Sequence, residues 1–168
     1  MQDSTHSCRR IELAEFEALP VVLRSSIEMS VTPAQLFQSL EGVDDWLAWV
    51  PVLNRVTWTS PQPFQIGTTR TVEMIGGIVG GEEFLAWESG RRMAFRFNEA
   101  SMKKLAALGE DYLIEETTSG CRLHWVMVID YQGSLGLLLR SMTPLLRWNQ
   151  RRYLKGLKSL LEARHAEA

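Results

Sequence analysis

The C-terminal stretch from about Ser134 to about Arg164 constrains the fold more than any other part of this chain, because it follows the period of one long α-helix. Positions three and four residues apart lie on one helix face. That face would carry Leu138, Met142, Leu145, Asn149, Tyr153, Leu157 and Leu160. The basic residues between them fall mostly on faces that solvent can wet. About thirty helical residues span roughly 45 Å, so the stripe needs a broad concave sheet to cover it.

Pro144 interrupts this predicted helix. A proline inside a helix removes one backbone hydrogen bond and kinks the axis. A kinked helix cannot lie flat along its whole length on a curved sheet. The gap would be filled by large side chains or left as a cavity, and the kink could also be without function.

The remainder of the chain reads mainly as strands. Residues 21–31 have β-branched residues in partial alternation, which indicates a strand. Thr32 and Pro33 suit the start of a helix, and Gly42 and Pro51 divide and end a pair of short helices. Further strand patterns cover 54–59, 67–75, 79–88, 91–98, 111–117 and 121–131. Residues 99–109 have a helical or loop-like composition.

Strands that lack intervening crossover helices pair antiparallel. The order therefore predicts an α+β helix-grip fold: about seven strands wrapped around the C-terminal helix, with two short helices after the first strand. We expect residues 1–19 to be an extension, either a helix or an edge strand, residues 20–164 to be the domain, and residues 165–168 to be a tail.

Composition excludes several function classes. A formal net charge of −2 does not favour nucleic acid or an anionic membrane surface as the main partner. No apolar run is long enough to span a bilayer, and the N-terminus lacks the apolar core of a secretory signal. Two cysteines form no disulfide framework, so we expect a cytoplasmic protein, monomeric or homodimeric. Three scattered histidines with no paired-ligand motif predict no metal site, and we expect no cofactor.

Short motifs carry a family resemblance. SVTPAQLF at 30–37 is similar to a strand-to-helix entry, and WLAWVPVLNRV at 46–56 is similar to a segment with paired tryptophans and a proline. Gly67 followed by Arg70 resembles the third strand of that family, and Ser119–Gly120 before Trp125 resembles its last hairpin. Together these marks resemble the START-like or SRPBCC superfamily of the birch pollen allergen. The resemblance is closest to the polyketide cyclase/dehydrase and lipid transport branch.

The resemblance implies an apolar cavity between sheet and helix. Strand parity and helix phase give candidate lining residues. They are Trp46, Trp49, Val72, Met74, Phe95, Phe97, Trp125, Met127, Leu138, Met142, Leu145, Asn149 and Tyr153. From periodicity alone such a set is more typical of a solid core. Trp46 and Trp49 share a helix face and would either cap the open end of the sheet or act as a gate.

Arg70 is the main polar candidate, because strand parity with Val72 and Met74 turns it inward. A buried arginine requires a carboxylate or a ligand group as its partner. Alternatively, it lies at a strand end and reaches solvent. Asn149 could bind a ligand or a backbone group freed by Pro144, and Tyr153 could donate its hydroxyl to the same space.

No complete catalytic constellation is present. His124 faces away from the predicted cavity by parity, and Glu82 and Glu83 point to opposite sheet faces. We therefore expect a carrier or binding protein for a small hydrophobic molecule, lipid or polyketide-like. The alternative is a polyketide cyclase or dehydratase in which Arg70, Asn149 and Tyr153 orient a poly-carbonyl chain. A third possibility is that the apolar groove takes a segment of a partner protein.

Overall fold

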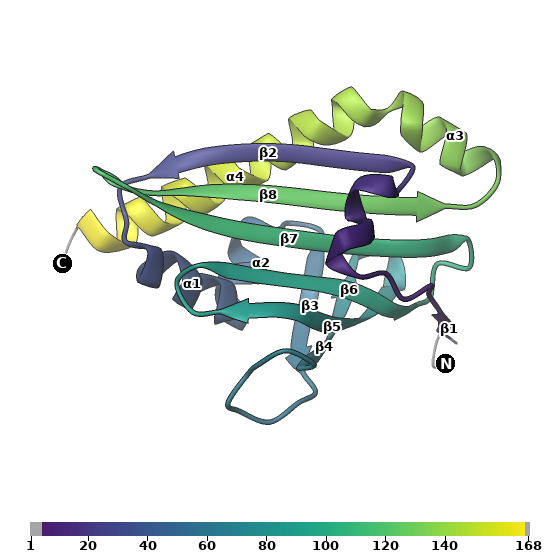
Figure 1. The fold of residues 1–168 in the computed structure, drawn as a ribbon, viewed down its shortest axis with the longest axis horizontal. Helices are drawn as coiled ribbons and strands as arrows, with labels where there is room; N and C mark the ends of the chain where they lie inside the picture. The colour runs from purple at the N-terminus through teal and green to yellow at the C-terminus, as the bar shows by residue number, and fades with distance from the viewer. Residues whose placement is uncertain (1–4, 167–168) are drawn as a thin grey trace.

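The computed structural model describes residues 5–166 and shows an antiparallel sheet curved around a long helix (Figure 1). The strands are β1 (His6–Ser7), β2 (Val21–Met29), β3 (Leu53–Trp58), β4 (Thr69–Met74), β5 (Ile78–Glu88), β6 (Arg92–Ala100), β7 (Leu105–Thr117) and β8 (Gly120–Tyr131). The helices are η1 (Leu13–Ala18), α1 (Pro33–Glu41), α2 (Val43–Trp49), η2 (Ile75–Gly77), α3 (Ser134–Ser141) and α4 (Thr143–Ala166).

The strand order is β2-β8-β7-β6-β5-β4-β3, and β1 pairs with β6. Each neighbouring pair along this path is antiparallel. The predicted α+β helix-grip fold is confirmed, with α1 and α2 inserted between β2 and β3.

Local chemistry sets the two short helices in place. The Oγ1 atom of Thr32 accepts a hydrogen bond from the Gln35 amide at 3.2 Å, and the Gln35 side chain accepts one from the Thr32 amide. This reciprocal cap fixes the start of α1. The Arg164 guanidinium donates two hydrogen bonds to Asp45, at 2.6 and 2.8 Å, and holds the pKa of that carboxyl below its usual value. The ion pair ties α2 to the end of α4.

The predicted helix or loop at 99–109 is wrong. β6 continues to Ala100 and β7 begins at Leu105, so only residues 101–104 form a loop between the two strands. The alanine, leucine and lysine content of this stretch favours a helix locally. Pairing of β7 with β8 from Leu105 onward overrides that preference, because strand formation depends on neighbouring strands more than on composition.

The single kinked helix predicted for the C-terminal stretch is also wrong. The chain forms two helices, α3 and α4, which separate at Met142, where ψ is 2° rather than the helical value. Pro144 therefore lies in the first turn of α4, where its missing amide hydrogen leaves no helical bond unmade.

The helix phase changes at this break. Leu138 and Leu145, predicted to face the sheet, are 51% and 54% exposed. Met142 is half-buried, and Arg151 and Arg152 are exposed, as predicted. The buried face of α4 consists of Gln150, Leu154, Leu157 and Leu161.

Residues 6–19 cover the convex face of the sheet. The amphipathic piece at 11–19 contains the 3-10 helix η1, and the short strand β1 comes before it and pairs with β6. Ile11, Phe16 and Leu19 are buried in a small cluster with Ala107 and Val128. Figure 1 shows η1 crossing β7 and β8 on the face away from α4.

Two further features bear on the sequence predictions. In residues 5–166, no helix has the length and apolar character needed to cross a membrane. Cys8 and Cys121 are both buried free thiols.

Candidate functional site

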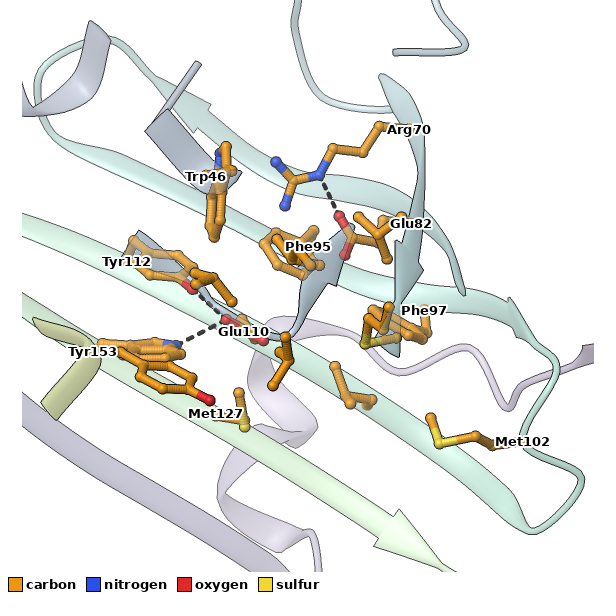
Figure 2. A pocket seen from close by; sticks show the side chains of 17 residues that line it. Trp46, Arg70, Glu82, Phe95, Phe97, Met102, Glu110, Tyr112, Met127 and Tyr153 are labelled. Atoms are coloured by element: carbon orange, nitrogen blue, oxygen red, sulfur yellow. Dashed lines mark hydrogen bonds and ion pairs between the residues drawn. The ribbon is translucent and has the colours of Figure 1, made fainter. Parts of the chain in front are cut away.

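A cavity of about 140 Å³ lies on the concave face of the sheet, beneath α2 and α4. Its wall is mostly apolar, with polar side chains only at a few points (Figure 2). Several lining positions are among the predicted ones: Trp46, Val72, Met74, Phe95, Phe97, Trp125, Met127 and Tyr153. The alternation of side chains along the strands therefore predicts correctly which of these residues face the cavity.

Five predicted lining residues lie elsewhere. Leu138 and Leu145 are exposed on the surface, and Met142 lies at the break between α3 and α4. Trp49 is buried behind the cavity wall, with its ring centroid 5.7 Å from that of Trp125. Asn149 is half-buried and donates a 3.4 Å hydrogen bond to the hydroxyl of Tyr153, so it contacts the cavity only through that residue.

Trp46 is firmly held. Its indole Nε1 donates a 2.7 Å hydrogen bond to the carbonyl oxygen of Leu40, and its ring lies 5.0 Å from that of Trp49. Both indoles are 3% exposed. Because so much apolar contact resists local opening, the observed packing favours the cap over the gate.

Arg70 and Glu82 form a buried ion pair inside the cavity. They are directly opposite each other in the β4–β5 ladder, and Arg70 Nε donates a hydrogen bond to the Glu82 carboxylate. Their side chains are only 1% and 4% exposed. Burial raises the pKa of Glu82, and the positive charge of Arg70 counteracts this. Arg70 therefore faces inward, as the parity argument expects.

The Arg70 guanidinium is enclosed by aromatic rings. Its central carbon lies 4.4 Å from the ring centroid of Trp46 and 4.8 Å from that of Phe95. Among the described residues, Nη1 has no hydrogen-bond partner. A buried charged donor without a partner is costly, and Arg70 is one of the residues that line the cavity.

A second polar cluster lies on β7 and β8. Glu110 accepts hydrogen bonds from the Tyr112 hydroxyl and, at 2.9 Å, from Trp125 Nε1. Burial raises the pKa of Glu110 to about 7, with a further contribution from the nearby charge of Glu82. The pKa of Tyr112 lies well above its ordinary value, because of burial and the adjacent Glu110. Tyr112 thus stays a donor, while Glu110 can gain or lose a proton near neutral pH.

The two clusters occupy the same part of the cavity. Figure 2 shows Arg70, Glu82, Glu110 and Tyr112 gathered near Trp46, with Met102 farther along the strands. The cavity therefore has a polar part and an apolar part. In residues 5–166, no group of three His, Cys, Asp or Glu side chains could hold a metal ion.

Sequence reasoning missed Glu82, Glu110 and Tyr112. Glu82 was considered only as a partner of Glu83, although it faces the same side of its strand as the buried Phe84. Glu110 fell between the predicted helix or loop at 99–109 and the strand predicted at 111–117, so it was assigned to neither. The alternation of Glu110, Tyr112 and Ile114 was the signal that could have placed the carboxyl on the inner face.

Residues 20–162 match the family described as polyketide cyclase / dehydrase and lipid transport. The chain belongs to this family. Family and fold together imply hydrophobic-ligand binding or polyketide cyclase-like chemistry. An uncharacterised protein of Mycobacterium tuberculosis (strain H37Rv) is 44% identical over 163 residues, which cover 97% of this chain and 98% of that protein.

Solved structures of this fold show the same arrangement at low sequence identity. The di-domain ARO/CYC StfQ from the steffimycin biosynthetic pathway superposes with a TM-score of 0.72 at 15% identity, covering 91% of this chain and 54% of that chain. A START superfamily protein from Mycobacterium smegmatis gives a TM-score of 0.69 at 9% identity, covering 84% and 97%. These likenesses establish the fold of this family member and say nothing about its ligand.

Proposed function

We propose that this protein binds a small, mostly apolar molecule that carries one carbonyl or hydroxyl group, and that it acts as a carrier or binding protein. The supporting observation is that Arg70 Nη1 has no hydrogen-bond partner among residues 5–166, in a residue that lines a mostly apolar cavity. A ligand oxygen that accepts from Nη1 would satisfy the buried donor, while the ligand's apolar part would contact Phe97 and the methionines.

The cavity size limits the ligand. A volume of about 140 Å³ suits a single-ring compound, since a cavity of about 150 Å³ takes benzene. Larger ligands would have to displace side chains. Met74, Met102 and Met127 line the cavity, and unbranched methionine side chains adapt readily to a new shape. Lipid or polyketide-like ligands would therefore enter by repacking these methionines.

The binding test compares two one-ring probes of similar size, acetophenone and ethylbenzene, by calorimetric titration of the full-length protein. The carbonyl-bearing probe should bind about tenfold more tightly, because a hydrogen bond to a charged group contributes about 1.5–3 kcal/mol. Met74→Trp should abolish binding of both by filling the cavity. Ile75→Trp, at the neighbouring exposed position, should leave both unchanged. Equal affinity for the two probes would contradict the role of Arg70.

A second candidate function is polyketide cyclase-like proton transfer, and the raised pKa of Glu110 favours it. An acid or base is most effective when its pKa is near the working pH. The Glu110 carboxylate would remove a proton from the carbon next to a carbonyl, and Arg70 would stabilise the resulting enolate oxygen. The proton on Glu110 then exchanges with solvent, and transfer of the new proton from Glu110 to the enolate carbon regenerates the ketone and the carboxylate.

The reaction is tested by hydrogen–deuterium exchange of cyclohexanone in D₂O, followed by NMR. The wild-type protein should speed exchange at the carbons beside the carbonyl, and Glu110→Gln should remove the effect while preserving an acceptor for Tyr112 and Trp125. If cyclohexanone exchanges no faster with the wild-type protein than with Glu110→Gln, then Glu110 does not catalyse proton transfer and only the binding function is left.

A further inference from the structure

α3 and the start of α4 expose large apolar side chains. Leu137 and Trp148 are 67% and 58% exposed, close to the values for Leu138 and Leu145. No residue of α3 is buried. Figure 1 shows α3 at the upper right, near the end of β8, and the first turns of α4 above β2. These four residues, Leu137, Leu138, Leu145 and Trp148, are called the apolar face below.

The charges around the apolar face have one sign. Between Gln132 and Leu161, the six charged residues are all arginine or lysine, although the whole chain has a formal net charge of −2. Arg140, Arg151, Arg152 and Lys155 are exposed. None of these four forms an ion pair within residues 5–166. The positive charge is therefore not neutralised locally.

The apolar and basic groups share one surface. Leu145, Trp148 and Arg152 follow one another at steps of three and four, so they lie on one side of α4. The Arg152 guanidinium lies 5.9 Å from the Trp148 ring centroid. Helices that combine leucine and tryptophan with flanking arginines lie in the interface of a bilayer, with their apolar side chains below the headgroups.

We propose that α3 and the first turns of α4 dock this protein on the surface of an anionic lipid bilayer. The apolar face would enter the headgroup region, and the surrounding arginines would attract anionic lipids. Charge complementarity favours a bilayer over a second copy of this chain, because a two-fold interface would bring the same arginines together. This docking is independent of the proposed function, although Tyr153 of α4 also lines the cavity.

The test is flotation of the full-length protein with vesicles. Vesicles of phosphatidylcholine in which a third of the lipid is phosphatidylglycerol should carry the protein upward, and vesicles of phosphatidylcholine alone should carry much less. Leu145→Ser/Trp148→Ser should lower partitioning about tenfold. The matched control Ile66→Ser/Ile75→Ser changes two isoleucines that are equally exposed elsewhere and should change partitioning less than twofold.

The charge is tested in the same way. Arg151→Glu/Arg152→Glu should lower partitioning at least tenfold, since each basic residue near an anionic surface contributes about fivefold. Arg55→Glu/Arg91→Glu makes the same change in net charge at two exposed positions outside this surface and should have a much smaller effect. Melting temperatures of all four variants should stay near the wild-type value, because the substituted residues are exposed.

Several results would overturn the proposal. Failure of the wild-type protein to float with anionic vesicles is one, and equal losses in the docking and control variants is another. Light scattering supplies the third: a stable dimer that Leu145→Ser/Trp148→Ser dissociates would assign the apolar face to self-association.

Discussion

At the residue scale, Glu110 is the group whose chemistry depends most on its surroundings. Its pKa is about 7 instead of 4.5 because burial disfavours the carboxylate, even with Tyr112 and Trp125 donating to it. The folded protein therefore holds a proton on Glu110 at pH values where the unfolded chain has lost it. A carboxyl of this kind stabilises the fold at low pH, and that contribution declines as the pH rises from about 4.5 to about 7.

Glu110→Gln should remove this dependence. A difference of about 2.5 pKa units corresponds to roughly 3 kcal/mol, so the free energy of unfolding of the wild type should fall relative to Glu110→Gln by up to that amount between pH 4.5 and 7.5. Urea denaturation across this range measures the difference. Because burial also raises the pKa of Glu82, both proteins share that contribution. Parallel pH profiles would show that Glu110 titrates normally.

The residue scale also shows what the sequence could and could not predict. Alternation placed Arg70 inside the cavity because Val72 on the same strand is plainly apolar. The same rule could not identify its partner, since the pairing of Arg70 with Glu82 depends on the β4–β5 register. Glu110 looks like a surface residue in the sequence, and only the ladder with β8 brings Trp125 beside it.

At the element scale, the C-terminal helix shows how one break changes a whole face. Extending a single helical period from Leu138 through Met142 gave a stripe containing Leu145 and Tyr153. The break at Met142 rotates α4 about its axis relative to a continuous helix, so Gln150 and Leu154 face the sheet instead. Gln150 accepts a 2.8 Å hydrogen bond from Ser25 and donates one to the Trp125 carbonyl oxygen. A buried polar residue at this position was not predictable from apolar periodicity.

The observed orientation of α4 on the sheet predicts opposite outcomes for two of its leucines. Leu154→Ala should lower the free energy of unfolding by about 2–5 kcal/mol, because it empties a fully packed site; Leu154 is 1% exposed. Leu145→Ala should change it by less than about 0.5 kcal/mol, as is usual for an exposed position. Urea denaturation of both variants checks the assignment. A large loss of unfolding free energy for Leu145→Ala would show that Leu145 faces the sheet, as the sequence predicts.

At the scale of the whole molecule, the succession of strands and helices along the chain was predictable, because hairpin turns and alternation mark those features directly. The sequence did not show that the sheet has two apolar faces. Gly109 illustrates why: a Cβ atom there would lie 2.5 Å from the Phe16 ring. The absence of a side chain on β7 makes room for a ring from the N-terminal segment, and no local pattern links the two positions.

The convex-face cluster predicts that residues 11–19 belong to the folding unit, although the family match begins at residue 20. Phe16→Ala should lower the free energy of unfolding by about 3–5 kcal/mol, because the ring is 4% exposed against the sheet. Glu15→Ala, at a neighbouring exposed position, is the matched control and should cost less than about 1 kcal/mol.

A chain that starts at residue 20 should melt at a clearly lower temperature than the full chain, since it loses the burial of Ile11, Phe16 and Leu19 together. Thermal unfolding by circular dichroism measures all three. Unchanged melting of the shortened chain would mean that the burial of Ile11, Phe16 and Leu19 does not stabilise the fold, and that the stabilising core lies on the concave side of the sheet.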